Sequence, residues 1–161
     1  MKKINFILSI FFLSQLGFSL PLKAQSRCQA TINSIVNEIE SKGVRRVILT
    51  KRTVTNRRNP TNRTNEISFV LSPYNESYTS LDTRSDRIVD NIMRSPVLMK
   101  SYADRIVSNC QDIAVVAFVA GGSDWRIEFA IQSDGKTQER TECIQPDDPL
   151  TPNWNQMSSC H

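Results

Sequence analysis

Four cysteines limit how this chain can fold, and all of them lie beyond its first 24 residues, at Cys28, Cys110, Cys143 and Cys160. An even number of cysteines in an exported chain predicts disulfides, which form in oxidising compartments and are rare in the cytosol. A zinc site is the alternative, but zinc ligands usually occur in closely spaced pairs. The sequence has no C-x-x-C pair, and its single histidine is the last residue. We therefore expect two disulfides and no metal site.

The first 24 residues are the reason to expect export. Lys2 and Lys3 precede a mostly apolar stretch over residues 4–20, and Leu22-Lys23-Ala24 then offers a cleavage site that ends in a small residue. This order is typical of a secretory signal. An uncleaved membrane anchor is the alternative, but the stretch is short for a span and is interrupted by polar residues. We expect cleavage after Ala24, no membrane attachment afterwards, and a secreted or periplasmic product.

Removal of this segment lowers the net charge and leaves a chain of one expected domain and a tail. The whole chain of 161 residues carries 20 Lys and Arg against 16 Asp and Glu, a formal net charge of +4. Three of the lysines lie in residues 1–24, so 17 basic residues remain against 16 acidic ones, and net charge gives no support to nucleic-acid binding. We expect a signal peptide at residues 1–24, a single domain at residues 25–144 and a proline-rich, irregular tail at residues 145–161.

Two main helices and a shorter one are predicted from apolar spacing. Ser26 suits the N-cap of a helix over residues 27–41, in which Cys28 lies on the buried face and Gly43 provides a left-handed C-terminal cap. Ser95-Pro96 begins the second main helix, because Ser suits the N-cap and Pro the first helical position. This helix ends at Cys110, which continues its apolar face. The shorter helix lies before it, with Ser85 as its expected cap.

Strands are predicted by alternating or densely apolar segments at residues 44–54, 67–71, 113–120, 125–131 and 137–144. The first two flank a polar loop at residues 56–65. The last two flank the turn Ser133-Asp134-Gly135, so both pairs are expected to form hairpins. Separate runs of helices and hairpins predict an α+β fold, an antiparallel sheet of four to five strands with two main helices packed on one face.

The two main helices also favour one of the three ways to pair four cysteines. If these helices lie antiparallel on the sheet, the start of the first meets the end of the second. Cys28 then lies close to Cys110. Cys143 and Cys160 remain, and their disulfide would hold the tail against the sheet.

The sequence carries no specific motif for catalysis, so we expect no catalytic residues and no cofactor. A Ser or Cys nucleophile needs a base, and His161 lies at a chain end, where side chains are rarely held rigidly. Asp124, Glu128, Glu139 and Glu142 are candidates for a carboxylate pair, but we expect them on the solvated side of the sheet. A hydrolase is therefore the least favoured function.

The basic block from Lys42 to Arg63 is the one unusual feature of composition. It holds eight Lys and Arg residues and no Asp or Glu. Arginines bind phosphate, sulfate and carboxylate groups through charge-assisted hydrogen bonds, but the block lacks aromatic residues for base stacking. The candidate residues for binding an acidic protein or a polyanion are Lys51, Arg52, Arg57, Arg58 and Arg63. The alternative is a solvated surface that prevents self-association or pairs with the acidic C-terminal part.

The layout of the chain is the basis of a family resemblance. A signal is followed by Cys28, the helix start Ser95-Pro96-x-Leu98 leads to Cys110, and an apolar strand at residues 113–121 precedes Trp125. This layout resembles short exported proteins of unknown function encoded by cyanobacteria, and it covers most of the mature chain. The resemblance implies no activity and no site residues. We therefore expect a small, disulfide-bonded exported domain with a binding or structural role. The alternative is an inhibitor, or a binder of a polyanion or an acidic partner, that uses the basic hairpin at residues 42–63.

Overall fold

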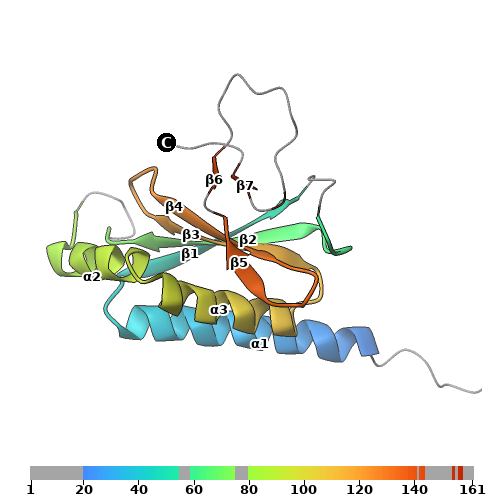
Figure 1. Ribbon diagram of the computed structural model, residues 1–161. Helices are drawn as coiled ribbons and strands as arrows, with labels where there is room; N and C mark the ends of the chain where they lie inside the picture. Colours follow the sequence, from blue (N-terminus) through green and yellow to red (C-terminus); the bar gives the residue numbers. More distant parts are fainter. Residues whose placement is uncertain are drawn as a thin grey trace, which may run out of the picture.

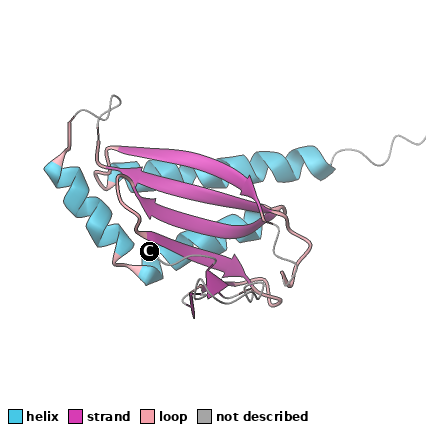
Figure 2. Ribbon diagram, turned by 90° about the horizontal axis from the view of Figure 1, so that it is seen from above, coloured by secondary structure: helices cyan, strands magenta, loops and turns pink. Residues whose placement is uncertain are grey.

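The computed structural model describes residues 20–54, 59–74, 80–140, 142–143, 154 and 156–157. Its helices are α1 (Leu20–Ser41), α2 (Thr83–Met93) and α3 (Pro96–Asn109). Its main sheet consists of β1 (Arg46–Thr53), β2 (Asn65–Ser72), β3 (Ile113–Ala120), β4 (Arg126–Ile131) and β5 (Thr137–Glu139), in that spatial order. The helices lie on one face of this sheet (Figures 1 and 2). The expected α+β fold is confirmed.

The sheet is mostly antiparallel, with one parallel pair. β1 and β2 form an antiparallel hairpin, and β3, β4 and β5 follow one another antiparallel. β2 and β3 run parallel, because α2 and α3 carry the chain back to the end of the sheet where β2 began. The turn between β4 and β5 is the predicted one, with Gly135 at φ +81°.

The hydrophobic core lies between the sheet and the helices. Ile67, Phe69 and Leu71 alternate along β2 and are all buried. Phe69 stacks on Phe118 of β3 with ring centroids 5.5 Å apart, and Tyr102 of α3 packs 6.4 Å from Phe118. β3 is buried on both faces, which explains why its sequence is an unbroken apolar run instead of an alternating one.

The N-terminal ends of α1 and α2 differ from the expected ones. Ser26 lies inside α1, which already runs at Leu20, so the predicted cap at Ser26 was wrong. Pro21 fits a first helical turn, and the residues after it are good helix formers, so the helix extends in the N-terminal direction. The predicted cap at Ser85 was also wrong: Asp82 accepts the backbone N–H groups at the start of α2, while the buried Ser85 accepts the N–H of Arg45.

Other helix ends were predicted correctly. Gly43 follows α1 with φ +109°, the left-handed conformation expected of its C-terminal cap. Pro96 begins α3 and Cys110 caps its C-terminus. Among the described residues, no helix is long and apolar enough to cross a membrane.

The disulfide between Cys28 and Cys110 joins the start of α1 to the end of α3, as predicted, with 4.7 Å between the two Cα atoms. Side-chain contacts continue along the same pair of helices, where Arg105 of α3 forms an ion pair with Glu38 of α1 at 2.7 Å. Cys143 lies in β6 (Glu142–Cys143), but Cys160 lies outside the described residues. The second pairing therefore stays a prediction.

Two contacts of the C-terminal part of the chain lie among the described residues. β6 pairs in parallel with β7 (Gln156–Met157), so the strand predicted over residues 137–144 forms as the two short strands β5 and β6. Trp154 is buried, and its indole N–H donates to the Ile131 carbonyl at 2.7 Å. At least this residue of the segment expected to be an irregular tail belongs to the core.

Candidate functional site

A groove lies at the end of the molecule that carries the Cys28–Cys110 disulfide. The start of α1, the last part of β1, β2 and the turn before β3 all border it. Its volume is about 440 Å³, within the range of small-ligand sites. Ile32, Leu49 and Ile67 form an apolar wall, and Gln25 and Gln111 contribute amides at the rim. We call this the disulfide-end groove.

An ion pair fixes one side of the groove rim. Lys51 donates to Asp112 with 2.7 Å between Nζ and Oδ2, and the side-chain amide of Asn65 donates to the same oxygen at 3.0 Å. Partial burial would raise the pKa of Asp112, but the Lys51 ammonium and the Asn65 amide outweigh it and hold the pKa below its usual value. The carboxylate is therefore charged at neutral pH, and the rim is close to neutral here.

Arg63 is a structural anchor near this end. Its Nη1 donates to the carbonyl oxygens of Val107, Cys110 and Ile113, at 2.6, 3.0 and 3.1 Å. These carbonyls belong to the last turn of α3, the residue that caps it and the first residue of β3, where helix termini leave acceptors without partners. Burial lowers the pKa of Arg63 from its usual value, but a guanidinium stays charged. The side chain thereby ties the start of β2 to the disulfide end.

Arg52 belongs to a different site, on the sheet face opposite the helices. There Arg52, Arg126 and Arg140 surround two carboxylates, and we call the five residues the Arg–Glu cluster. Glu66 is 2% exposed and Glu128 is 5% exposed. Arg52 contacts Glu66 at 2.8 Å, Arg126 contacts Glu128 at 2.7 Å, and Arg140 contacts the other oxygen of Glu128 at 2.7 Å. The expectation that Glu128 lies on a solvated face was wrong, because three cations compensate its burial.

The electrostatics of the Arg–Glu cluster favour a structural role over hydrolysis. Burial alone would raise the pKa of Glu66, but hydrogen bonding and charge from Arg52 and Arg126 lower it overall. A general acid needs the opposite shift, towards a protonated carboxyl at neutral pH. These ion pairs could not be predicted from the sequence, because facing charges are recognised only when the register of β1, β2 and β4 is known.

The predicted basic residues do not converge on a single site. Lys51 and Arg52 are consecutive in β1 and therefore point to opposite faces of the sheet, one to the groove rim and one to the Arg–Glu cluster. Arg63 binds backbone carbonyls, as described above. Arg57 and Arg58 lie outside the described residues. Of the three predicted residues that the structure describes, only Lys51 borders the disulfide-end groove.

The described part of the chain shows no cluster of metal-ligating side chains. No three His, Cys, Asp or Glu side chains gather there as a potential metal site. His161 lies outside the described residues. Comparison of the chain with protein-family models, with curated proteins and with solved structures found no match.

Proposed function

We propose that this protein is a small exported domain, stabilised by disulfides, which binds a partner at the disulfide-end groove. The observation that carries the proposal is the groove itself, in which Leu49 stays 39% exposed although it points to the helix side of the sheet. The signal-like N-terminus and the Cys28–Cys110 disulfide support export. Apolar walls with a few polar groups at the rim are typical of binding sites.

The charge of β1, the strand that borders the groove, supports an acidic protein partner. β1 contains Arg46, Lys51 and Arg52 and no acidic residue. Arg46 forms no ion pair with any other described residue, whereas Lys51 is neutralised by Asp112. An acidic segment would therefore gain attraction next to an apolar contact, which favours encounter as well as specificity.

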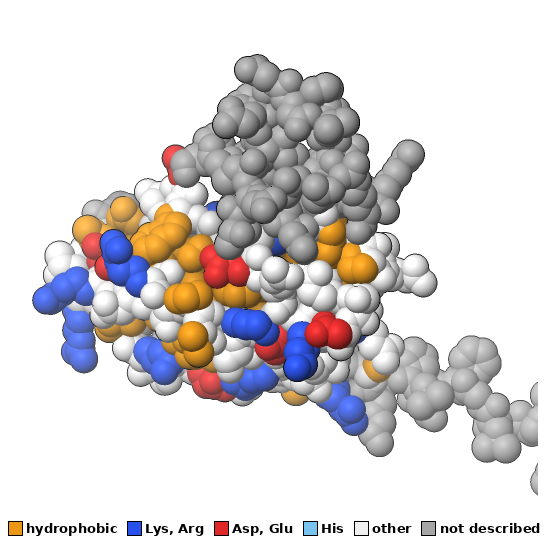
Figure 3. Space-filling model, viewed as in Figure 1, with side chains coloured by type: hydrophobic (Ala, Val, Ile, Leu, Met, Phe, Trp, Pro, Cys, Tyr) orange, Lys and Arg blue, Asp and Glu red, His pale blue; other side chains and the backbone are white. Residues whose placement is uncertain are grey.

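A matched pair of substitutions tests the groove. Leu49→Glu places a negative charge in the groove, and Val97→Glu makes the same change at the start of α3, where Val97 is 81% exposed. Hydrophobic side chains also gather near α2 and β4, towards the end of the sheet away from the disulfide (Figure 3). Binding to an array of acidic peptides should fall by at least about tenfold for Leu49→Glu and stay unchanged for Val97→Glu. Equal binding by both variants would contradict the proposal.

A polyanion is the second candidate, because the basic block Lys42–Arg63 ends close to the groove. The test is retention on heparin at increasing salt, before and after the double substitution Arg57→Ser and Arg58→Ser. Arg63 stays unchanged, since its loss would disturb the carbonyl contacts at the end of α3. Earlier elution of the double variant supports this candidate, and unchanged elution removes it.

A further inference from the structure

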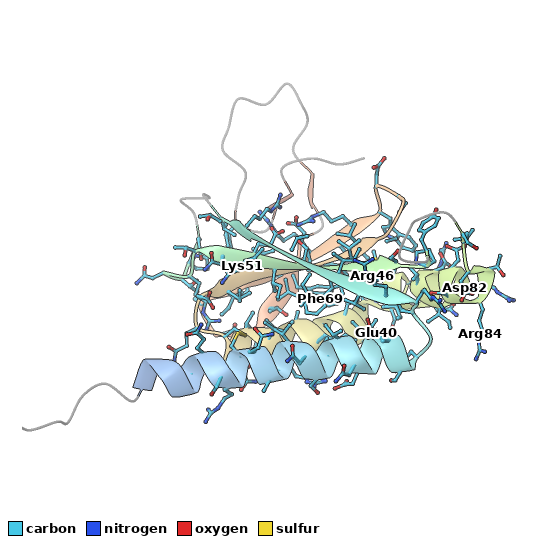
Figure 4. The ribbon with its side chains drawn as sticks, turned by 180° about the vertical axis from the view of Figure 1, so that it is seen from behind. Glu40, Arg46, Lys51, Phe69, Asp82 and Arg84 are labelled. Atoms are coloured by element: carbon cyan, nitrogen blue, oxygen red, sulfur yellow. A yellow bond between two sulfur atoms is a disulfide. The ribbon has the colours of Figure 1, made fainter. Side chains whose placement is uncertain are left out.

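β1 is an edge strand of the sheet, and its outer side has backbone groups without a partner among the described residues. The Val54 N–H donates to the Thr64 carbonyl in the neighbouring hairpin strand, at 2.7 Å. The Val47 N–H points the other way and donates to Glu40 Oε1 of α1, at 3.1 Å. Because hydrogen-bonding direction alternates along an antiparallel strand, Leu49 and Lys51 direct their N–H and C=O groups away from β2. Figure 4 shows β1 in the foreground, with α1 running below it.

The helix side of this edge opens into the disulfide-end groove. Leu49 and Lys51 point to this side and line the groove together with Ile32 of α1. Any strand added beside β1 would alternate its side chains between the two faces of the sheet. Those on the helix side would enter the groove next to Leu49, where an apolar side chain would be removed from water.

The opposite face of the same edge is basic. Arg46 and Arg52 point there, and 60% of the Arg52 side chain is exposed despite its contact with Glu66. Acidic side chains of an added strand would meet these two arginines. Antiparallel pairing of two copies of β1 centred on Leu49 is disfavoured, because it places Arg46 of one copy opposite Arg52 of the other, and like charges in facing positions are destabilising.

We propose that β1 binds an extended segment of a partner protein as an added strand, with apolar side chains in the disulfide-end groove alternating with acidic side chains that face Arg46 and Arg52. Main-chain hydrogen bonds to Leu49 and Lys51 would bind a strand of any sequence. The groove on one side of β1 and the two arginines on the other would select its side chains. This inference rests on the proposed function, since it names the chemistry of the partner that the same groove takes.

The first experiment uses a peptide of about seven residues that alternates Val and Glu, titrated against the exported protein by calorimetry. Two further peptides carry N-methyl groups on either the Val or the Glu amides, so that each blocks one edge of the peptide. Strand addition predicts that one methylated peptide loses binding and the other keeps it within about twofold. Equal binding of all three peptides overturns strand addition but leaves the proposed function standing. A peptide alternating Val and Lys should not bind, and failure of every acidic peptide would overturn both proposals.

The second experiment reverses one charge on the protein. Arg46→Glu should weaken binding of the Val–Glu peptide by about tenfold or more, which corresponds to about 1.4 kcal/mol. Arg84→Glu is the matched control, because Arg84 is an exposed arginine of α2 and lies far along the molecule from Lys51, which borders the groove (Figure 4). An equal loss of peptide binding in both variants would show that net charge alone explains the effect. It would overturn the placement of the acidic side chains opposite Arg46.

Three outcomes would assign the edge to another occupant and overturn the proposal. Heparin that displaces the peptide would identify a polyanion site. Concentration-dependent dimers that Leu49→Pro abolishes would identify a second copy of the chain, since proline removes an outward N–H at an edge position. Tighter peptide binding after Asp147→Asn and Asp148→Asn would identify the acidic C-terminal part of this chain.

Discussion

Glu66 shows how a single buried charge is accommodated in this protein. Its carboxylate is almost fully enclosed, but Arg52 and Arg126 bind its two oxygens and Ser68 donates to it at 2.9 Å. Removing one partner from such a set leaves the others with an uncompensated charge or an unpaired group. We expect Glu66→Gln to lower the free energy of unfolding by about 1–3 kcal/mol, measured by urea denaturation. The control is Glu139→Gln, a partly exposed glutamate for which no ion pair exists among the described residues, and an equal loss there would contradict this account.

The same residue predicts the direction of a pH effect. The pKa of Glu66 is lower in the folded protein than its ordinary value of 4.5, so its charged form stabilises the fold. This contribution is complete above the ordinary pKa and is lost as the pH falls through the lower, folded value. When the pH falls from about 5 to about 3, the free energy of unfolding should decrease more for the original protein than for the Glu66→Gln variant. Parallel curves for the two proteins would show that Glu66 is not a source of acid sensitivity.

Arg63 illustrates what composition cannot distinguish. In the sequence it is one more cation of the basic block, and only the tertiary structure shows that it binds three carbonyls at the end of α3. We expect Arg63→Met to lower the melting temperature, with a loss of about 1–3 kcal/mol in the free energy of unfolding. Heparin retention should change by no more than the loss of one exposed charge. A large change in retention with unaltered melting would restore Arg63 as a ligand-binding residue.

At the scale of elements, the sequence predicted which segments fold and missed how they begin and pair. Apolar spacing is a property of many residues, so α1, α3 and the five strands were recognised. A helix cap depends on one residue among several suitable ones, and Asp82 was chosen over Ser85 because Ser85 is buried and contacts Arg45. The parallel pairing of β2 with β3 requires the path of the chain through α2 and α3, which no local pattern contains.

The disulfide between α1 and α3 yields a prediction at this scale. Replacing Cys28 and Cys110 together by serine removes a crosslink between positions 82 residues apart in the sequence, and we expect a loss of about 2–4 kcal/mol in the free energy of unfolding. Arg105→Met removes the ion pair to Glu38, which is partly exposed, and should cost less than about 1 kcal/mol. Chemical denaturation of both variants measures the difference. A larger loss for Arg105→Met would mean that the ion pair, not the disulfide, holds the helices together.

At the scale of the whole molecule, the candidate site could be predicted only in part. The basic character of β1 is visible in the sequence. The groove is not, because residues from α1, β1, β2 and the turn before β3 come together only in the folded chain. The Arg–Glu cluster likewise combines four separate segments. Properties that add along the chain were recognised, whereas properties that need distant partners were not, except for the Cys28–Cys110 pairing, which followed from the expected antiparallel packing of the two main helices.

Export gives the last prediction. Intact mass of the protein recovered outside the cytoplasm should correspond to a chain that begins at Gln25. Ala24 and Gln25 both border the groove, so cleavage between them would place a new α-amino group at its rim. A species that retains Met1 in the membrane fraction would contradict cleavage at this position.

If the groove binds a partner as proposed, the disulfide that borders it makes this binding depend on the redox state of the surrounding compartment. Cys28 lines the groove and is held there by Cys110, so a chain whose thiols are reduced lacks the covalent link that fixes one wall. Newly made chains in a reducing cytosol would therefore have a weak or absent affinity for the partner, and the affinity would develop only after arrival in an oxidising compartment. Under this proposal, the protein and its partner could be synthesised in the same cell without binding each other before export.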